Sequence, residues 1–269
     1  MRGRLGYFAR GSNEVCDVEY CAVLVPKLQE TLERVRKEIK VETAGALPQL
    51  RHIEAVSGDE GVSVATGDID LAGFNAANVS RRIGNETYHF SAEGFFQINH
   101  ELLEPLINEA ISDIKGKTAI DLYCGVGLFT LPLARRFELV VGIETNGRAT
   151  ECARQNLESA KLENARIVTS RAGDWLKKHS LSFDSVDFLL LDPPRTGAEN
   201  REIEGIVALH PRQVAYVSCD PATLARDLKK LIAGGYTLDS VTAFDMFPQT
   251  HHVETVVRLS RNNGFNREP

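Results

Sequence analysis

The sequence has 269 residues, of which 43% are hydrophobic and 25% are charged, as in an ordinary globular protein. No stretch approaches the roughly 20 apolar residues of a membrane helix, and no apolar run follows the arginines near the start. We therefore expect neither a membrane span nor a secretion signal. A net charge of −6 disfavours strong binding of a polyanion by the chain alone. The five cysteines are an odd, scattered set, which argues against a disulfide framework and for the reducing cytoplasm.

Residues 1–90 have the pattern of a small α+β lobe. One highly charged stretch carries an apolar residue every three to four positions, and this spacing predicts a single amphipathic helix. The apolar positions are Leu28, Leu32, Val35 and Ile39. Alternating apolar runs bounded by glycine follow at 52–58 and 61–67, and they predict short strands joined by tight turns.

From residue 91 to residue 262 strands alternate with helices, which predicts an α/β domain with a mostly parallel sheet covered on both faces. Seven strands are expected, at 118–122, 139–143, 166–168, 186–191, 213–218, 236–244 and 253–259. Apolar spacing predicts helices before the first strand and after the fifth. The last two strands have no helix between them, so we expect an antiparallel pair. Residues 263–269 are expected to form a frayed tail.

A Gly-x-Gly turn leads from the first of these strands into a helix. Gly125 and Gly127 allow the backbone to turn tightly and to approach a ligand at the carboxyl end of the strand. Thr130 stands where a dinucleotide-binding turn has its third glycine, and this favours a ligand without pyrophosphate. Glu144 ends the second strand, where a carboxylate can accept hydrogen bonds from ribose hydroxyls. These residues suit an adenosine; a plain turn and a surface carboxylate are the alternatives.

Asp192 follows the fourth strand and precedes two prolines. Proline fixes the backbone and removes a hydrogen-bond donor, so we expect a rigid loop, tipped by an acid, at the carboxyl edge of the sheet. Such a loop can shape a slot for a planar base. A loop that only turns the chain is the alternative.

Cys219 ends the fifth strand, and Glu254 opens the last one. A helix follows Cys219, and its dipole is expected to favour a thiolate. A thiolate can add to an electrophilic carbon, and a carboxylate on the opposite side can remove a proton, so the two residues suit covalent catalysis. The alternatives are an inert buried cysteine and a solvated carboxylate at a strand start.

Six stretches together resemble the RNA 5-methyluridine (uracil-C5) methyltransferases of the bacterial type, and those of 23S rRNA in particular. The stretches are FFQIN at 95–99, DLYCGVGLFTLPLA at 121–134, GIE at 142–144, LLDPPRTG at 190–197, VSCDPATLARDL at 217–228 and DMFPQTHHVE at 245–254. The resemblance extends over most of the chain. It implies a Rossmann-like class I methyltransferase fold, S-adenosylmethionine as methyl donor, and RNA as substrate, with rRNA favoured over tRNA.

The resemblance also implies roles for individual residues. Cys219 would attack C6 of the uracil, and Glu254 would accept the proton from C5. Four side chains would contact the methyl donor: Gln97, Tyr123, Glu144 and Asp192. Phe96 would help to build the slot for the base, with packing at a helix entry as an equal alternative. Arg195 would contact phosphate or the base, which must leave a folded RNA to reach the thiolate.

The sequence departs from the family pattern in several ways. It lacks both the N-terminal β-barrel and the cysteine-rich run that binds an iron–sulfur cluster in many members. Cys21 resembles the last cluster ligand without its partners, so we expect no cluster. His251 and His252 have no acid or cysteine at ligand spacing, so we expect no metal site. A helper RNA-binding domain or subunit would replace the barrel. Leu128 and Arg171 replace polar donor contacts, which predicts weaker donor binding.

Three other functions are compatible with parts of this pattern. A cytosine-5 RNA methyltransferase shares the thiolate chemistry, but its family carries Pro-Cys after the acid of the fourth strand, where this chain has Pro-Pro-Arg. An amino-group methyltransferase would use Asp-Pro-Pro and needs no thiolate. A truncated relic that acts as a binding module would account for the missing barrel and the negative charge.

Overall fold

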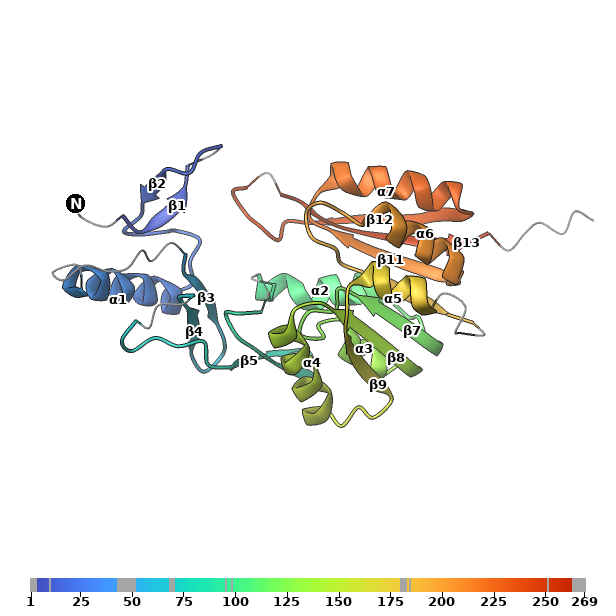
Figure 1. Cartoon of the computed structure of the whole chain (residues 1–269), viewed down its shortest axis with the longest axis horizontal. Helices are drawn as coiled ribbons and strands as arrows, with labels where there is room; N and C mark the ends of the chain where they lie inside the picture. Colours follow the sequence, from blue (N-terminus) through green and yellow to red (C-terminus); the bar gives the residue numbers. More distant parts are fainter. Residues whose placement is uncertain are drawn as a thin grey trace, which may run out of the picture. The chain divides into compact units, whose positions relative to one another are not determined.

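The computed structural model describes residues 4–9, 11–42, 52–67, 71–94, 96–97, 99–179, 183, 185–250 and 252–262. Phe95, His251 and the expected tail at 263–269 lie outside the described residues. The chain divides into two compact units (Figure 1). The first comprises Met1–Arg81 and Phe90–Glu93, and the second comprises Arg82–His89 and Gly94–Pro269. The division expected after residue 90 falls within the short segment that returns to the first unit.

The first unit contains the predicted amphipathic helix. Its elements are β1 (Gly6–Phe8), β2 (Val15–Asp17), α1 (Pro26–Glu42), β3 (Glu54–Ser57) and β4 (Val62–Ala65). Helix α1 buries Leu28 and Val35, two of the four apolar positions that predicted it. Strands β3 and β4 pair antiparallel, as the glycine-bounded runs predicted. Two further strands, β5 (Val79–Ile83) and β6 (Glu86–Phe90), pair with each other, and their residues are divided between the first and the second unit.

The second unit contains the α/β domain. Its helices are α2 (His100–Ile111), α3 (Thr130–Ala134), α4 (Gly147–Ser159), α5 (Ala172–His179), α6 (Asn200–Leu209) and α7 (Pro221–Ala233). Its strands are β7 (Gly116–Leu122), β8 (Phe137–Glu144), β9 (Ala165–Thr169), β10 (Phe188–Leu191), β11 (Gln213–Ser218), β12 (Tyr236–Phe244) and β13 (Glu254–Arg261). All seven predicted strands are confirmed, with ends that differ by at most two residues.

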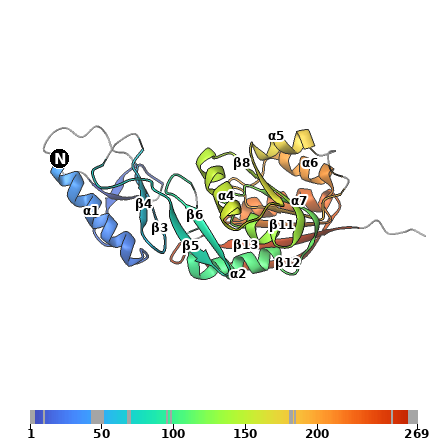
Figure 2. The same ribbon diagram turned by 90° about the horizontal axis from the view of Figure 1, so that it is seen from below.

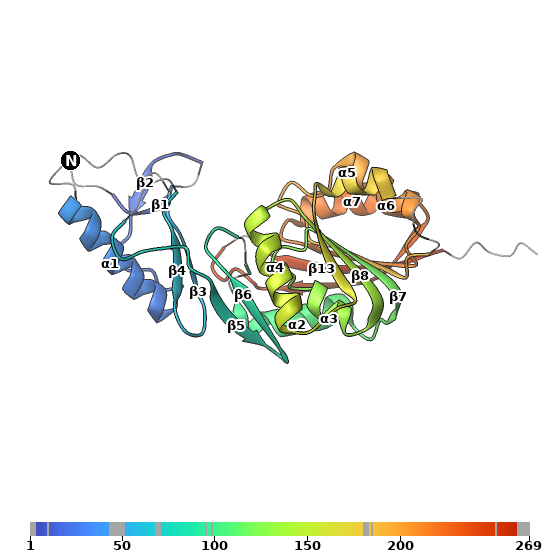
Figure 3. The same ribbon diagram turned by 60° about the horizontal axis from the view of Figure 1, so that its bottom comes forward.

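The seven strands form one sheet in the order β12-β13-β11-β10-β7-β8-β9. Neighbours from β11 to β9 pair in parallel, whereas β13 runs antiparallel to both β11 and β12. The predicted antiparallel pair is confirmed, and β13 lies inside the sheet while β12 forms its edge. Helices α5, α6 and α7 cover one face, and α2 lies on the other (Figures 2 and 3).

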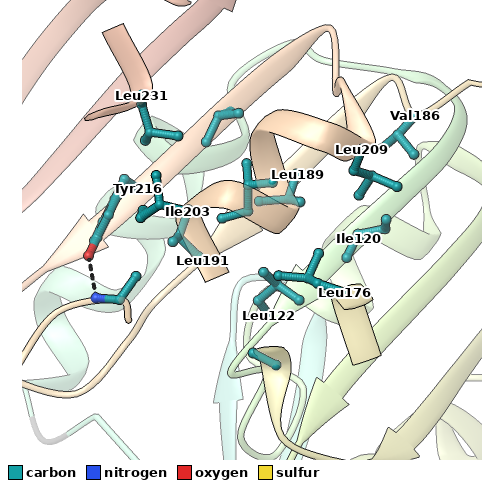
Figure 4. Packing of buried hydrophobic residues seen from close by; sticks show 14 of the residues in the cluster. Ile120, Leu122, Leu176, Val186, Leu189, Leu191, Ile203, Leu209, Tyr216 and Leu231 are labelled. Atoms are coloured by element: carbon teal, nitrogen blue, oxygen red, sulfur yellow. Dashed lines mark hydrogen bonds between the residues drawn. The ribbon is translucent and has the colours of Figure 1, made fainter. Parts of the chain in front are cut away.

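The main core lies between the sheet and helices α5, α6 and α7 (Figure 4). Strand β10 is buried along its whole length, because both faces of a parallel sheet are covered and the strand therefore needs apolar residues on both sides. Leu176 of α5, Ile206 of α6 and Leu231 of α7 are fully buried against the strands. This packing fixes the strand ends that carry the candidate site. No helix in the described part of the chain is long and apolar enough to span a membrane.

Candidate active site

The carboxyl ends of the central strands meet at one edge of the sheet. Leu191, the last residue of β10, pairs with Leu122 of β7 on one side and with Tyr216 of β11 on the other. Asp192 follows directly, and its backbone N–H donates to the carbonyl of Leu122 at 3.3 Å. Cys219 leaves β11 in the same direction. Asp192 and Cys219 therefore lie at the same edge of the sheet, as expected from the sequence.

The Gly-x-Gly turn is held from several sides. Gly125 and Gly127 have φ values of 53° and 92°, which side chains disfavour. Two carbonyls of the turn accept hydrogen bonds from side chains outside it. Asn156 of α4 donates to the carbonyl of Val126 at 2.9 Å, and Tyr88 of β6 donates to that of Leu128 at 3.0 Å. These two hydrogen bonds hold the backbone of the turn in place.

The carboxylate of Glu144 is oriented by backbone amides. One oxygen, Oε1, accepts from the N–H groups of Thr145 and Asn146 at 2.7 and 2.8 Å. The other, Oε2, accepts from the N–H of Gly125 at 3.1 Å. These bonds join the end of β8 to the glycine turn and leave lone pairs of the carboxylate available for a ligand hydroxyl.

The side chain of Tyr123 is bonded to helix α6 and packed against the main core. Its φ of 63° lies in the left-handed region, and its hydroxyl donates to Glu202 of α6 at 2.5 Å. The ring packs against the main core. Burial, followed by this hydrogen bond, raises the pKa of Tyr123 above its usual range. A contact of this residue with a ligand would therefore come from its backbone.

Three carboxyl groups with raised pKa values lie at this edge, two of them buried and Asp192 partly buried, and sequence reasoning missed one of them. Asp121 of β7 is fully buried and accepts a hydrogen bond from Thr130 Oγ1 at 2.5 Å. Burial raises its pKa to about 7, against the lowering effect of Thr130. An acid inside the apolar run of the first strand was the signal. Asp192 and Glu254 are the other two, and burial is the main cause that raises the pKa of each.

Gln97 links this cluster to the segment before α2. It is 6% exposed, and its side chain hydrogen-bonds the carboxyl group of Asp192. Within the described residues its Oε1 has no partner, and neither has Oδ1 of Asp121. Buried polar atoms rarely remain unsatisfied, so these two oxygens indicate that a polar ligand group completes the site.

Cys219 and Glu254 are neighbours across the sheet. The antiparallel ladder ends with the pair Ser218 and Thr255, and Cys219 and Glu254 are the residues that directly flank this last pair. Glu254 is 1% exposed, and both carboxylate oxygens are buried with no partner in the described part of the chain. Burial raises its pKa from 4.5 to about 7. The pair expected from the sequence is therefore brought together.

The thiol of Cys219 does not ionise as readily as the sequence suggested. Burial first, then the negative charges of Glu254 and Asp192, raise its pKa, and the positive charge of Arg195 and a backbone hydrogen bond oppose them. The expected effect of the helix dipole is outweighed. The side chain of Asp220 also occupies the first N–H groups of α7, those of Ala222 and Thr223.

The remaining predicted residues lie in different surroundings. Phe96 is buried, and its ring lies 6.2 Å from that of Tyr88, so it is part of a packed region. Arg195 is exposed on the loop after Asp192, and Arg171 is also exposed. Leu128 is buried. The described residues contain no group of three His, Cys, Asp or Glu side chains placed to hold a metal ion.

The sheet combines this strand order with one reversed strand, β13, and with the Gly-x-Gly turn after β7. Together these features define a Rossmann-like class I methyltransferase fold. The family model for tRNA (uracil-5-)-methyltransferase matches residues 75–262, and the chain belongs to this family. The tRNA (uracil-54, C5)-methyltransferase of Pyrococcus abyssi, solved with S-adenosyl-L-homocysteine, has a similar structure. The TM-score is 0.72 at 26% identity, over 94% of this chain and 72% of that one.

Two bacterial relatives resemble the chain along most of its length. An uncharacterized RNA methyltransferase of Streptomyces avermitilis is 35% identical over 96% of this chain and 64% of its own length. The 23S rRNA (uracil(1939)-C(5))-methyltransferase RlmD of Cronobacter sakazakii is 32% identical over 96% of this chain and 67% of its own length. The chain thus spans about two thirds of the length of these relatives.

Proposed function

We propose that this chain transfers a methyl group from S-adenosylmethionine to C5 of a uridine in RNA, with Cys219 as covalent nucleophile and Glu254 as base. The observation that carries the proposal is the register of β11 and β13, because Cys219 and Glu254 flank the last pair of this ladder at the edge that also holds Asp192. Membership of the family and the similarity to a tRNA uracil-C5 enzyme support it.

The residues at the edge fit the methyl donor. Glu144 would accept hydrogen bonds from the ribose hydroxyls, while the backbone of Gly125 and Gly127 allows close approach. Gln97 and Asp192 would hold the amino acid end, because an amide oxygen without a partner among the described residues and a partly buried carboxylate both suit an ammonium group. When bound, S-adenosylmethionine supplies an electrophilic methyl group. Tyr123 would take part through its backbone.

Cys219 makes the unreactive C5 of uracil nucleophilic. Its thiolate forms a bond to C6, and the electrons of the C5–C6 double bond move toward the C4 carbonyl, which gives an enolate with carbanion character at C5. The positive charge of Arg195 stabilises the thiolate against the carboxylates around it. Arg195 would also contact a phosphate or the base, and Phe96 would support the wall of the base slot.

Glu254 completes the reaction. After C5 has been methylated it still carries its original proton, and the carboxylate of Glu254 takes this proton. The C5–C6 double bond then forms again, the C6–S bond breaks, and Cys219 leaves as a thiolate. A base works best when its pKa is close to the working pH, and burial raises that of Glu254 to about 7.

The RNA is proposed to be ribosomal, because a relative named for 23S rRNA is similar over 96% of this chain. The family model and the similar crystal structure carry the names of tRNA enzymes, so both RNAs belong in the assay. A cytoplasmic location and a helper RNA-binding domain or subunit are parts of the same proposal, since a net charge of −6 provides little attraction for phosphates.

The experiment is trapping with RNA that contains 5-fluorouridine. Fluorine at C5 cannot leave as a proton, so the covalent adduct persists after methylation and migrates slowly on a denaturing gel. We expect an adduct that depends on S-adenosylmethionine with the wild-type chain and with Cys16→Ser, and none with Cys219→Ser. With ordinary RNA, Glu254→Gln is expected to accumulate the methylated adduct, whereas Glu204→Gln on the exposed face of α6 turns over normally.

The same assay separates the other functions. Methylation at full rate by Cys219→Ser would support an amino-group methyltransferase, and release of tritium from cytosine C5 rather than uracil C5 would support a cytosine enzyme. Absence of both donor binding and adduct, with rRNA and with tRNA, would favour a binding module.

A further inference from the structure

The loop after β10 is tied to the helix that follows Cys219 by a buried polar network. Asp227 of α7 has no exposed surface and accepts hydrogen bonds from two groups outside its helix. These are the backbone N–H of Ala198, at 2.9 Å, and the hydroxyl of Tyr216, at 2.8 Å. The Ala198 N–H also donates to the Tyr216 hydroxyl at 3.1 Å, which is the dashed line in Figure 4. The end of the loop is therefore fixed to both β11 and α7.

Arg226 closes the network from the solvent side. Its guanidinium donates to both oxygens of Asp227 at 2.8 and 3.1 Å, and it also donates to the carbonyls of Thr196 and Ala198 at 2.9 and 3.3 Å. The planar guanidinium bonds both oxygens of a carboxylate and two carbonyls at once, a fixed bidentate geometry that the point charge of a lysine does not provide. Neutralising Asp227 in this way makes its burial tolerable.

Two further features show how closely the loop and α7 fit. Gly197 has a φ of 73°, and a Cβ there would lie 2.5 Å from Asp227 Oδ2 and 2.6 Å from an Arg226 nitrogen. The hydroxyl of Thr223 shares its proton between the carbonyl of Arg195, at 3.3 Å, and that of Asp220, at 3.1 Å. The backbone of Arg195 is thus bonded to the first turn of the helix that begins two residues after Cys219.

We propose that Arg226 and Asp227 are positioning residues, which hold the segment Thr196–Ala198 against α7 and so keep Arg195 beside Cys219. The charged groups that act on this thiol are Arg195 on the loop, Asp192 at the start of the same loop and Glu254 on β13. Two of the three are acidic, so the position of the one cation controls how readily the thiolate forms. The inference rests on the proposed role of Cys219, but its test needs no RNA.

The test measures the rate at which iodoacetamide alkylates Cys219 at pH 7.5, read by mass spectrometry of the peptide in a Cys16→Ser, Cys21→Ser background. Arg195→Gln and Arg226→Gln are each expected to slow alkylation about threefold or more, because both remove the cation from beside the thiol. The double variant is expected to be no slower than Arg195→Gln alone, since Arg226 acts through Arg195. Lys229→Gln removes the same charge from an exposed position on α7 and is expected to leave the rate unchanged.

Two results would overturn the inference. One is an unchanged alkylation rate in Arg226→Gln; the other is that Arg226→Gln slows alkylation by the same factor in the Arg195→Gln background as in the wild-type background. If Arg226→Gln does not fold, Thr223→Val serves, because it removes the bond to the Arg195 carbonyl with little change in shape, and the same double-variant comparison applies. Failure of the proposed function would look different. Cys219→Ser would methylate RNA normally while the alkylation rates still followed Arg195.

Discussion

Replacing Glu254 by glutamine should stabilise the protein while it abolishes turnover. The carboxyl group is 1% exposed, and burial raises its pKa from 4.5 to about 7, so the ionised form is disfavoured in the folded state. Below pH 4.5 the group is protonated in both states and costs nothing. The cost develops between pH 4.5 and 7 and is then constant, at about 3 kcal/mol for this difference in pKa. Removing the charge also lowers the pKa of Asp192, which Glu254 raises.

Urea unfolding at two pH values measures this effect. Glu254→Gln is expected to gain about 3 kcal/mol in free energy of unfolding at pH 8 and about 1 kcal/mol or less at pH 5, with the slope against urea unchanged. Glu204→Gln on the exposed face of α6 should gain nothing at either pH. A gain that is equal at both pH values would refute the reasoning, because it would come from packing rather than from the buried charge.

Other predictions concern the rate and the donor site. The kcat/KM for RNA should rise through about pH 7 as Glu254 ionises, and should continue to rise above it because burial raises the pKa of Cys219; a fall over pH 6–8 would contradict both roles. Tyr123→Phe should lower the free energy of unfolding by about 1–2 kcal/mol and leave donor affinity in calorimetry unchanged, and a tenfold loss of affinity would argue against a backbone contact. Gly142→Ala should lower stability by about 1–3 kcal/mol and weaken donor binding, because the added Cβ would lie 3.0 Å from Cys124 Sγ under the ligand turn; an unaltered variant would show that the turn can shift freely.

The sequence predicted the sheet well because its patterns are local. Each strand is a short apolar run bounded by polar or glycine residues, and the absence of a helix between the last two runs predicted their antiparallel pairing. Carboxyl ends of parallel strands share an edge, so the sequence alone predicts that Asp192 and Cys219 lie at the same edge of the sheet. Family resemblance then supplied roles for Gln97 and Tyr123 that no spacing could give.

Features that depend on long-range contacts were not predictable in this way. The direction of the Tyr123 ring follows from a positive φ and from an acceptor in α6, and neither is visible in the local sequence. The raised pKa of Cys219 depends on burial and on charges contributed by two other segments. Asp227 looks like an ordinary polar position in a helix until the loop that it binds is folded beside it.

The ladder between β11 and β13 has a consequence for how the enzyme can vary. The spacing of thiol and carboxylate is set by strand pairing and not by the segment at 245–253 that joins the last two strands. That connection could therefore lengthen or shorten while Cys219 and Glu254 keep their separation. A shift of pairing by a single residue, in contrast, would turn Glu254 to the other side of the sheet, so this protein tolerates changes in the connection much better than changes in strand register.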